Sequence, residues 1–233
     1  MSRIIHCTQQ DDLWVAAKVG RISGSNIDAL LAPPTTRQST RKGVVYPAGT
    51  EALEKAEYRR KLVAERIYGR AVNNVTTQYM KDGSDREPFA RMMYEAEMQT
   101  PVELVGFALH PEWDWFGCSP DGLCGDDGGL ELKCPTEMTH LAYADNPETL
   151  AEEYEGQCLS GLMCFPEREW WDCCAFHPYA PDAIKLVKAP RFYRSDWAET
   201  IARIEDEAQQ MNAQIEAEIA RRGLPPTQWA VMP

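Results

Sequence analysis

Residues 118–134 read CSPDGLC, then GDDGG, then LELKC. Pro120 cannot continue a central strand, so Asp121 is expected at or after a strand end. The glycine and aspartate cluster predicts a turn, and the alternating apolar and charged residues after it predict a strand. Glu131 and Lys133 are two residues apart on that strand, so their side chains share one face. The turn is therefore expected to fold Glu131 and Lys133 back beside Asp121.

Two carboxylates and one ammonium group at such a position favour metal chemistry. Adjacent carboxylates repel, so they either share a proton or hold a cation. Oxygen ligands suit Mg²⁺, with Mn²⁺ as a substitute, and the carbonyl of Leu132 adds a further ligand. A metal held this way activates water and neutralises a phosphodiester, while Lys133 orients or deprotonates the water or stabilises the transition state. Spacing alone, however, favours a hairpin with a turn aspartate and a surface Glu/Lys pair.

The remaining pattern alternates helical and strand-like segments, which indicates an α/β or α+β fold with helices around a mixed sheet of four or five strands. Helices are expected at 14–31 (with a turn near Gly20), 51–68 after a cap at Gly49 or Thr50, 88–98, 150–165 and after a cap at Ser195 or Asp196. Strands are expected at 102–109, 113–118, 130–134, 169–176 and 184–189. The final helix carries its apolar face on Ile201, Ile204, Ala208, Met211, Ile215 and Ile219. Residues 33–49 are expected to form a loop.

Composition narrows the class of protein. The chain has 233 residues and a net charge of −12, which excludes a protein that coats nucleic acid over its whole surface. No uncharged stretch reaches the ~18 residues of a membrane span, and the first residues lack the apolar core of a signal peptide. Eight cysteines in a chain of this length, without an export signal, indicate reduced thiols in the cytoplasm.

Positive charge is concentrated locally. Nine basic and four acidic residues lie between Arg37 and Arg70, a local charge of +5. One interpretation is a solvated helix face with ion pairs such as Glu51–Lys55. The other is contact with nucleic acid, for which the loop residues Arg37, Arg41 and Lys42 are the better candidates.

Residues 118–135 resemble the phage lambda exonuclease family, the YqaJ-type viral recombinases of the PD-(D/E)xK nuclease superfamily. Further similarity lies in DDLW at 11–14, KVG at 18–20 with 22–25, the Gly83–Glu87 segment and Gln157. This nearly contiguous match is far more specific than the bare spacing of Asp121, Glu131 and Lys133, and it favours catalysis.

The resemblance implies an α/β restriction-endonuclease-like core, with a central mixed sheet flanked by helices. It implies one nuclease domain over 1–233, with a mainly helical DNA-entrance part (1–100), a catalytic sheet core (101–190) and a C-terminal helix (191–233). The implied activity is a Mg²⁺-dependent 5′→3′ exonuclease on linear double-stranded DNA that leaves 3′ single-stranded tails. A homotrimeric ring and a single-strand annealing protein as partner are also implied. A site- or structure-specific endonuclease, or a non-catalytic DNA-binding module, are the alternatives.

By the same resemblance, Asp121 and Glu131 are metal ligands together with the Leu132 carbonyl, and Lys133 is the catalytic lysine. Glu87 is a further carboxylate of the site. Its alternative role is a capping box with Ser84, and Pro88 is expected to place Glu87 at the mouth of a helix.

The family holds a 5′ phosphate in a pocket that corresponds to Lys18, Ser25 and Ser119 of this chain. Lys18 stands where the family usually has arginine, so Arg21 is a second candidate for the cation. Met80 matches an apolar residue that separates the terminal base pair, with a core position as its alternative. Gln157 is the matching helix glutamine and a candidate DNA contact.

Overall fold

The computed structural model describes residues 2–36, 38–41, 44–72 and 78–229. Its α-helices are α1 (Asp12–Lys18), α2 (Ile27–Leu31), α3 (Leu53–Tyr68), α4 (Gln78–Met98), α5 (Glu137–Asp145), α6 (Pro147–Cys164) and α7 (Ala198–Ala220). Its strands are β1 (Arg3–Ile5), β2 (Ile22–Ser23), β3 (Ser39–Arg41), β4 (Val44–Tyr46), β5 (Val102–Glu103), β6 (Phe107–Leu109), β7 (Phe116–Cys118), β8 (Gly122–Cys124), β9 (Gly128–Lys133), β10 (Trp170–Phe176), β11 (Leu186–Lys188) and β12 (Phe192–Tyr193). Short 3₁₀ turns lie at Gly24–Asn26 and Asp182–Ile184.

The strands form two main sheets, where one mixed sheet of four or five strands was expected. The larger sheet has the order β11-β10-β9-β8-β5, with β12 also paired to β10, and β9 and β10 run parallel. The smaller sheet has the order β1-β6-β7-β2. Ser119, Pro120 and Asp121 separate β7 from β8. Because proline cannot donate to a ladder, the chain leaves one sheet there and enters the other. The mixed α/β class is confirmed.

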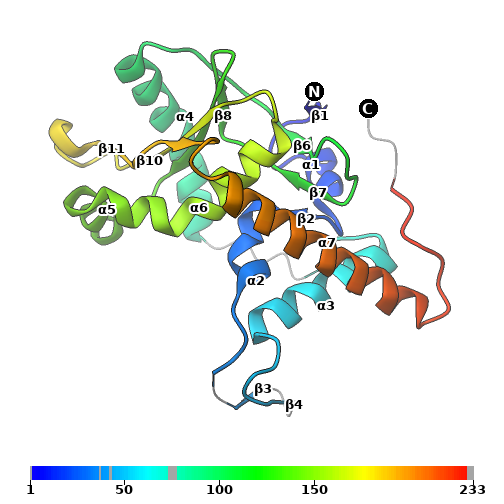
Figure 1. Cartoon of the computed structure of the whole chain (residues 1–233). Coiled ribbons are helices and arrows are strands. Elements are labelled where there is room, and N and C mark those ends of the chain that lie inside the picture. The colour runs from blue at the N-terminus through cyan, green and yellow to red at the C-terminus, as the bar shows by residue number, and fades with distance from the viewer. Residues whose placement is uncertain (1, 37, 42–43, 73–77, 230–233) are drawn as a thin grey trace.

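Helix α6 crosses over the larger sheet and connects its two parallel strands (Figure 1). Its close approach depends on glycines: a Cβ on Gly161 would lie 2.5 Å from the ring of Trp171, and one on Gly129 would lie 2.2 Å from it. The buried indole of Trp171 therefore fills the space between α6 and the sheet. This contact sets the distance between α6 and the sheet at β9.

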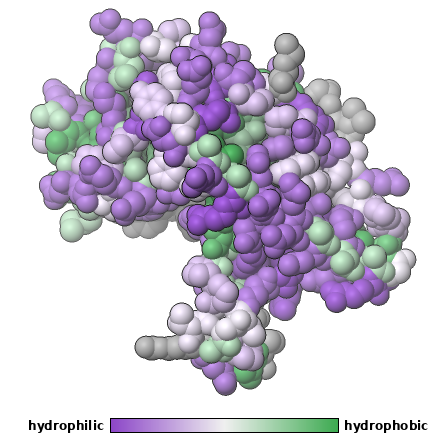
Figure 2. Space-filling view, in the orientation of Figure 1, coloured by the Kyte–Doolittle hydropathy of each residue, from purple (hydrophilic) through white to green (hydrophobic). Residues whose placement is uncertain are grey.

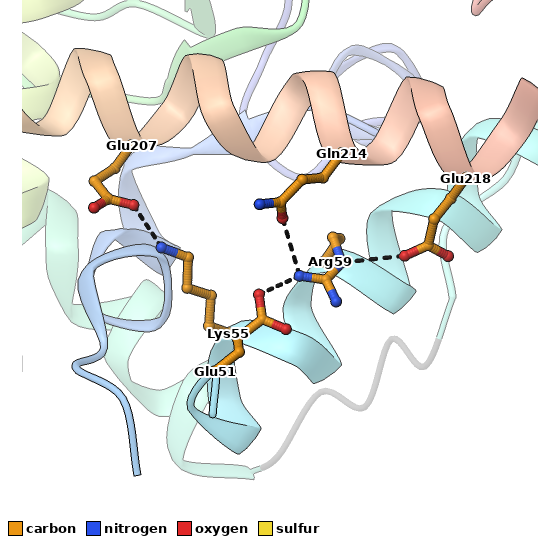
Figure 3. Close-up of polar contacts among 6 residues, drawn as sticks. All are labelled: Glu51, Lys55, Arg59, Glu207, Gln214 and Glu218. Carbon is orange, nitrogen blue, oxygen red and sulfur yellow. Dashed lines mark hydrogen bonds and ion pairs between the residues drawn. The ribbon is translucent and has the colours of Figure 1, made fainter. Parts of the chain in front are cut away.

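Helix α7 packs on α3 and α2 and also contacts α6 (Figure 1). All six apolar residues expected on its inner face are buried, and its outward side is hydrophilic (Figure 2). Arg59 of α3 contacts Glu51, Gln214 and Glu218, while Lys55 lies 2.5 Å from Glu207 (Figure 3). The expected Glu51–Lys55 pair is thus wrong, because this face of α3 packs on α7 and Lys55 has an acidic partner there.

Several helix boundaries differ from the expectations. Helix α4 begins at Gln78, ten residues before the expected start, and continues through Pro88. The second part of the expected 14–31 helix is a short strand and a 3₁₀ turn before α2. Neither α3 nor α7 has a side-chain cap, since their N-cap residues are Ala52 and Trp197. The αL turn at Gly20 (φ 72°) ends the first helical segment. At the other boundaries, tertiary packing outweighed the local capping signals.

Several segments were not expected from the sequence, among them the short strands β1 and β12. The loop at 33–49 contains the β3–β4 hairpin, which projects away from the rest of the molecule (Figure 1). Helix α5 follows Thr136 and was missed because it is short and comes directly after Pro135. All eight cysteines are free thiols. Among the described residues, no helix is long and apolar enough to cross a lipid bilayer.

Candidate active site

The β8–β9 hairpin brings Asp121 to the strand that carries Glu131 and Lys133. Gly122 pairs with Leu130 in the antiparallel ladder, and the Asp121 amide donates to the Leu130 carbonyl at 3.1 Å. The Leu132 amide in turn donates to Oδ2 of Asp121 at 2.6 Å. The Asp121 carboxylate is therefore fixed by the backbone of β9 beside the residues predicted to act with it.

Glu131 and Lys133 lie on one face of β9, as their spacing predicts. Nζ of Lys133 is 2.5 Å from Oε1 of Glu131 and donates to Oε1 of Gln157 at 2.8 Å. The same ammonium group lies 4.5 Å from the ring centre of Tyr154. Gln157 and Tyr154 are three residues apart on α6, so one face of this helix covers the lysine. Lys133 is held from both the sheet and the helix.

Glu87 reaches the same site from α4. It lines a cleft of about 760 Å³ together with Lys133 and Gln157. The expected position at a helix mouth is wrong, because α4 starts at Gln78 and Glu87 lies within it. The alternative capping box is also wrong, since Ser84 lies inside the helix and its hydroxyl accepts a hydrogen bond from Nε2 of Gln10 at 2.9 Å.

The carboxylates of the site are electrostatically crowded. Burial, and next the charge of Glu131, raise the pKa of Asp121 well above its usual range. Burial also raises the pKa of Glu87, with Lys133 opposing the shift and Glu131 adding to it. For Lys133, burial acts to lower the pKa, but the charges of Glu131 and Asp121 outweigh it and raise the pKa above its usual value. One lysine therefore faces three carboxylates.

This excess of negative charge fits a divalent cation. The donors are carboxylate oxygens, which are the ligands that Mg²⁺ and Mn²⁺ prefer. As placed, no group of three His, Cys, Asp or Glu side chains within the described part of the chain could hold a metal ion. The donors predicted from the sequence, the carboxylates of Asp121 and Glu131 and the Leu132 carbonyl, are oxygen ligands of the kind that such an ion takes.

A second cluster adjoins these residues. Lys18, Ser25 and Ser119 line one cavity of about 140 Å³, which Glu131 and Gln157 also line. Ser119 lies far from Lys18 and Ser25 in the sequence, and the parallel pairing of β2 with β7 brings it beside them. Lys18 and Ser25 further line the cleft of about 760 Å³ that contains Glu87 and Lys133. Glu131 thus shares the smaller cavity with the three predicted phosphate-binding residues, and Glu87 and Lys133 share the larger cleft with two of them.

Trp14 organises this second cluster and was missed from the sequence. Its Nε1 donates to Oγ of Ser119 at 2.8 Å, and its ring lies 4.0 Å from Nζ of Lys18. Its spacing of four residues from Lys18 on α1 was the available signal. Ser25 accepts a hydrogen bond from Nδ2 of Asn26 at 3.2 Å.

Arg21, the second candidate for the cation, lines the larger cleft but has its guanidinium bonded to the backbone. Its Nε donates to the Asp114 carbonyl and its Nη1 to the Ala17 carbonyl, both at 2.6 Å. The ring of Trp229 lies 4.5 Å from its guanidinium carbon. Burial lowers the pKa of Arg21 to about 10. The Arg21 guanidinium is buried and donates to backbone carbonyls. The Lys18 ammonium group instead lies over the Trp14 ring.

The predicted DNA contacts are only partly placed. Arg37 and Lys42 lie outside the described residues. Arg41 ends β3 and Met80 lies in α4, and the structure describes these two positions by their backbone alone. Gln157 accepts a hydrogen bond from Lys133 and so orients the lysine side chain.

Comparison with solved structures shows similarity of the whole fold. The solved structure of the alkaline exonuclease LHK-Exo from Laribacter hongkongensis is 29% identical, with a TM-score of 0.77 over 91% of this chain and 96% of that chain. The same protein in complex with dAMP gives the same values. A phage-related exonuclease from Haemophilus somnus 129PT is 12% identical, with a TM-score of 0.63 over 85% of this chain and 96% of that chain, and shares the fold.

The fold is therefore that of the restriction-endonuclease-like proteins, as expected. No curated protein matches the sequence. The family model of the YqaJ-like viral recombinase domain matches residues 13–165, which is more than half of the chain. This match contains Lys18, Ser25, Glu87, Ser119 and the whole β8–β9 hairpin. The chain belongs to the YqaJ-like viral recombinase family.

Proposed function

We propose that this protein is a Mg²⁺-dependent 5′→3′ exonuclease that degrades linear double-stranded DNA to mononucleotides and leaves 3′ single-stranded tails. The observation that carries the proposal is the shared cavity: Lys18, Ser25 and Ser119 lie in the same cavity as Glu131. A cation and hydroxyls suit a terminal phosphate, and a carboxylate–lysine cluster suits phosphodiester hydrolysis. Their adjacency favours cleavage close to a strand end.

The residues would divide the work as follows. Lys18, Ser25 and Ser119 hold the 5′ phosphate, which places the next phosphodiester over Asp121 and Glu131. A divalent metal bound by Asp121, Glu131 and the Leu132 carbonyl would supply Lewis-acid stabilisation of the phosphate. Lys133 keeps its proton, since the neighbouring carboxylates raise its pKa, and it stabilises negative charge on the reacting phosphate.

The structural neighbours add support. LHK-Exo is named an alkaline exonuclease, and its complex with dAMP contains a nucleoside monophosphate, the class of product that this reaction would release. Glu87 faces the same cleft from α4 and would orient water or a second metal. Gln157 would act through Lys133, to which it is hydrogen-bonded.

Digestion of linear duplex DNA tests the proposal. Duplexes with a 5′ phosphate or a 5′ hydroxyl are incubated with Mg²⁺, with Mn²⁺ or with EDTA, and nucleotide release is measured beside a closed circular duplex. We expect release from linear DNA only, faster from the phosphorylated end and dependent on the metal. Cleavage of the circle would instead identify an endonuclease. Absence of any metal-dependent cleavage would leave a non-catalytic DNA-binding module.

The resemblance to the lambda exonuclease family supports three wider proposals. The chain would form a closed homotrimer in the cytoplasm, which retains DNA between cuts. It would work with a single-strand annealing protein. Arg37, Arg41 and Lys42 would contact the duplex, with Met80 at the terminal base pair. Sedimentation equilibrium checks the assembly, and a single species of 26.4 kDa at working concentration would reject the ring.

A further inference from the structure

Lys61 is a cation of the cleft that neither its local sequence nor the family pattern singles out. It lies on α3, and it lines the cleft of about 760 Å³ together with Lys18 and Ser25. Its side chain is 41% exposed, so its ammonium group remains accessible to a ligand that enters the cleft. Lys18 comes from α1, so two different helices direct a lysine into the same space.

Two contacts fix the face of α3 that carries Lys61. One turn before it, the hydroxyl of Tyr58 accepts a hydrogen bond from the Ser23 amide at 3.0 Å. One turn after it, Oε2 of Glu65 accepts from the Gly20 amide at 3.0 Å. Residues three and four apart lie on one side of a helix, so Tyr58, Lys61 and Glu65 face the 20–23 segment together. The position of Lys61 relative to the predicted phosphate pocket is therefore set by the fold.

Of the two lysines, only Lys61 has an ion-pair partner among the described residues. Among the described residues, no ion pair within 4.0 Å involves Lys18, whose ammonium group lies over the ring of Trp14. Lys61 has Glu65 at 3.8 Å, but that carboxylate already accepts hydrogen bonds from the Gly20 and Val72 amides.

The charge of Lys61 acts on Lys18, with which it lines the cleft. Burial, and next the charge of Lys61, lower the pKa of Lys18 to about 8. Glu131, Cys118 and Glu65 act in the opposite direction with smaller effects. Repulsion between the two ammonium groups is thus the largest charge interaction at Lys18, and an anion bound between them would relieve it.

We infer that Lys61 is the second cation of the terminal-phosphate pocket, so that a phosphate monoester binds between Lys18 and Lys61 with hydroxyls from Ser25 and Ser119. The inference rests on the proposed function and names how its end recognition works. Arginine offers two parallel donors in a rigid fork, whereas lysine is a point charge. Two lysines on two helices would donate hydrogen bonds to the phosphate from two sides, whereas one arginine would donate both from a single side.

This arrangement selects by charge. A terminal phosphate monoester carries between one and a half and two negative charges near pH 7, because its second pKa is about 6. An internal phosphodiester carries one. Two ammonium groups therefore favour a strand end over the backbone, and each removed lysine should reduce that preference.

Binding measured without metal separates this inference from catalysis. Fluorescence anisotropy in EDTA gives the Kd of a hairpin duplex with a single 5′ end, either phosphorylated or hydroxylated. The proteins compared are wild type, Lys61→Gln, Lys61→Arg and Arg60→Gln. Arg60 is the matched control, since it is an exposed cation of the same helix that does not line the cleft. Circular dichroism melting verifies that each variant is folded.

We expect wild type and Arg60→Gln to prefer the phosphorylated end equally. Lys61→Gln should weaken binding of that end by roughly tenfold while the hydroxyl end changes little, and Lys61→Arg should retain the preference. A folded Lys61→Gln protein that keeps the full wild-type preference would overturn the role of Lys61. Absence of any preference in the wild type would overturn the pocket itself, and with it the end recognition of the proposed function. Loss of hydrolysis alone would leave these binding results unaffected.

Discussion

At the scale of single residues, the site shows charges that oppose the stability of the metal-free protein. Asp121 is fixed by the Leu132 amide beside Glu131, and the pKa of its carboxyl is raised well above the usual range by burial and then by Glu131. A group whose pKa is raised on folding stabilises the fold only when protonated. Stability from Asp121 is thus present at low pH and is lost as pH rises through its folded pKa. Active sites commonly retain such destabilising groups because function requires them.

Asp121→Asn should therefore abolish hydrolysis and stabilise the metal-free protein. An asparagine oxygen can still accept the Leu132 amide, but the negative charge beside Glu131 is gone. We expect a higher melting temperature in EDTA at pH 8, by about 2–4 °C for each 1 kcal/mol gained. Nucleotide release measures the loss of hydrolysis, and calorimetry with and without Mg²⁺ measures the change in melting temperature. Added Mg²⁺ should stabilise the wild type more than the variant.

Asp126→Asn is the control for this substitution, because Asp126 is exposed in the same hairpin turn. It should change neither activity nor melting temperature appreciably. A lower melting temperature for folded Asp121→Asn in EDTA would contradict the proposed crowding of charges.

At the scale of elements, α6 determines how the side chain of Lys133 is oriented. The helix supplies Gln157 and Tyr154 to Lys133, and its approach to the sheet depends on Gly161 against the ring of Trp171. The hairpin can form locally, since only a short turn separates its strands. The cover over Lys133 cannot, because α6 must first pack on the sheet.

Gly161→Ala should displace α6 and reduce both stability and turnover. The added methyl group would lie 2.5 Å from the buried Trp171 ring, and overpacking of this kind typically costs about 1–3 kcal/mol. Urea unfolding measures the loss. Turnover should fall more than the affinity for DNA, since the shift moves Gln157 away from Lys133.

Gly83→Ala provides the control within a helix. An added Cβ there has its nearest neighbour at 4.0 Å, the Cys134 carbonyl oxygen. Because alanine is the better helix former, this variant should be more stable by about 0.5–1 kcal/mol. Equal stability of Gly161→Ala and wild type would contradict the predicted overpacking, because it would show that a methyl group fits between α6 and Trp171.

At the scale of the whole molecule, His110 joins parts of the chain that are far apart in sequence. It follows β6, stacks on Trp113 with ring centres 3.9 Å apart, and has Glu205 of α7 at 3.6 Å from its Nε2. Its carbonyl accepts from Arg3 of β1 at 3.3 Å. Its Nδ1 accepts from the Glu112 amide, which requires the neutral ring. Burial, and next the charge of Arg3, lower the pKa of His110 to about 4.

Mild acid should therefore weaken the fold. A histidine whose pKa is lowered on folding stabilises the native state while it is neutral, and that stability is lost as pH falls from about 6.5 to about 4. We expect the urea midpoint to fall between pH 7 and pH 4.5. His110→Gln should start lower at pH 7, by about 1 kcal/mol for the lost stacking, and should then decline less steeply.

The exposed His6 gives the matched control, since His6→Gln should keep the wild-type slope. His140 contributes to the decline in the same direction, because burial lowers its pKa as well. A slope for His110→Gln that equals that of the wild type would assign the acid sensitivity to other groups.

Local sequence predicted the parts of the site that form within one hairpin. The placement of Asp121 beside Glu131 and Lys133 followed from a turn and a two-residue spacing, and the inner face of α7 followed from its periodicity. Capping residues were poor guides, because α4 extends through Pro88 and α7 begins without a side-chain cap. Capping residues do not predict a helix end where the packing of many residues outweighs one or two hydrogen bonds.

The sequence by itself determined the family, the mixed α/β class and the carboxylate–lysine set, since these depend on short-range order along the chain. Only the tertiary structure decided that Arg21 is bonded to backbone, that Gln157 holds Lys133 and that Lys61 faces Lys18. The physical reason is that each of these contacts joins elements from different parts of the chain, whose approach depends on side-chain packing in the core. Spacing along one strand or helix carries no information about which partner another element will present.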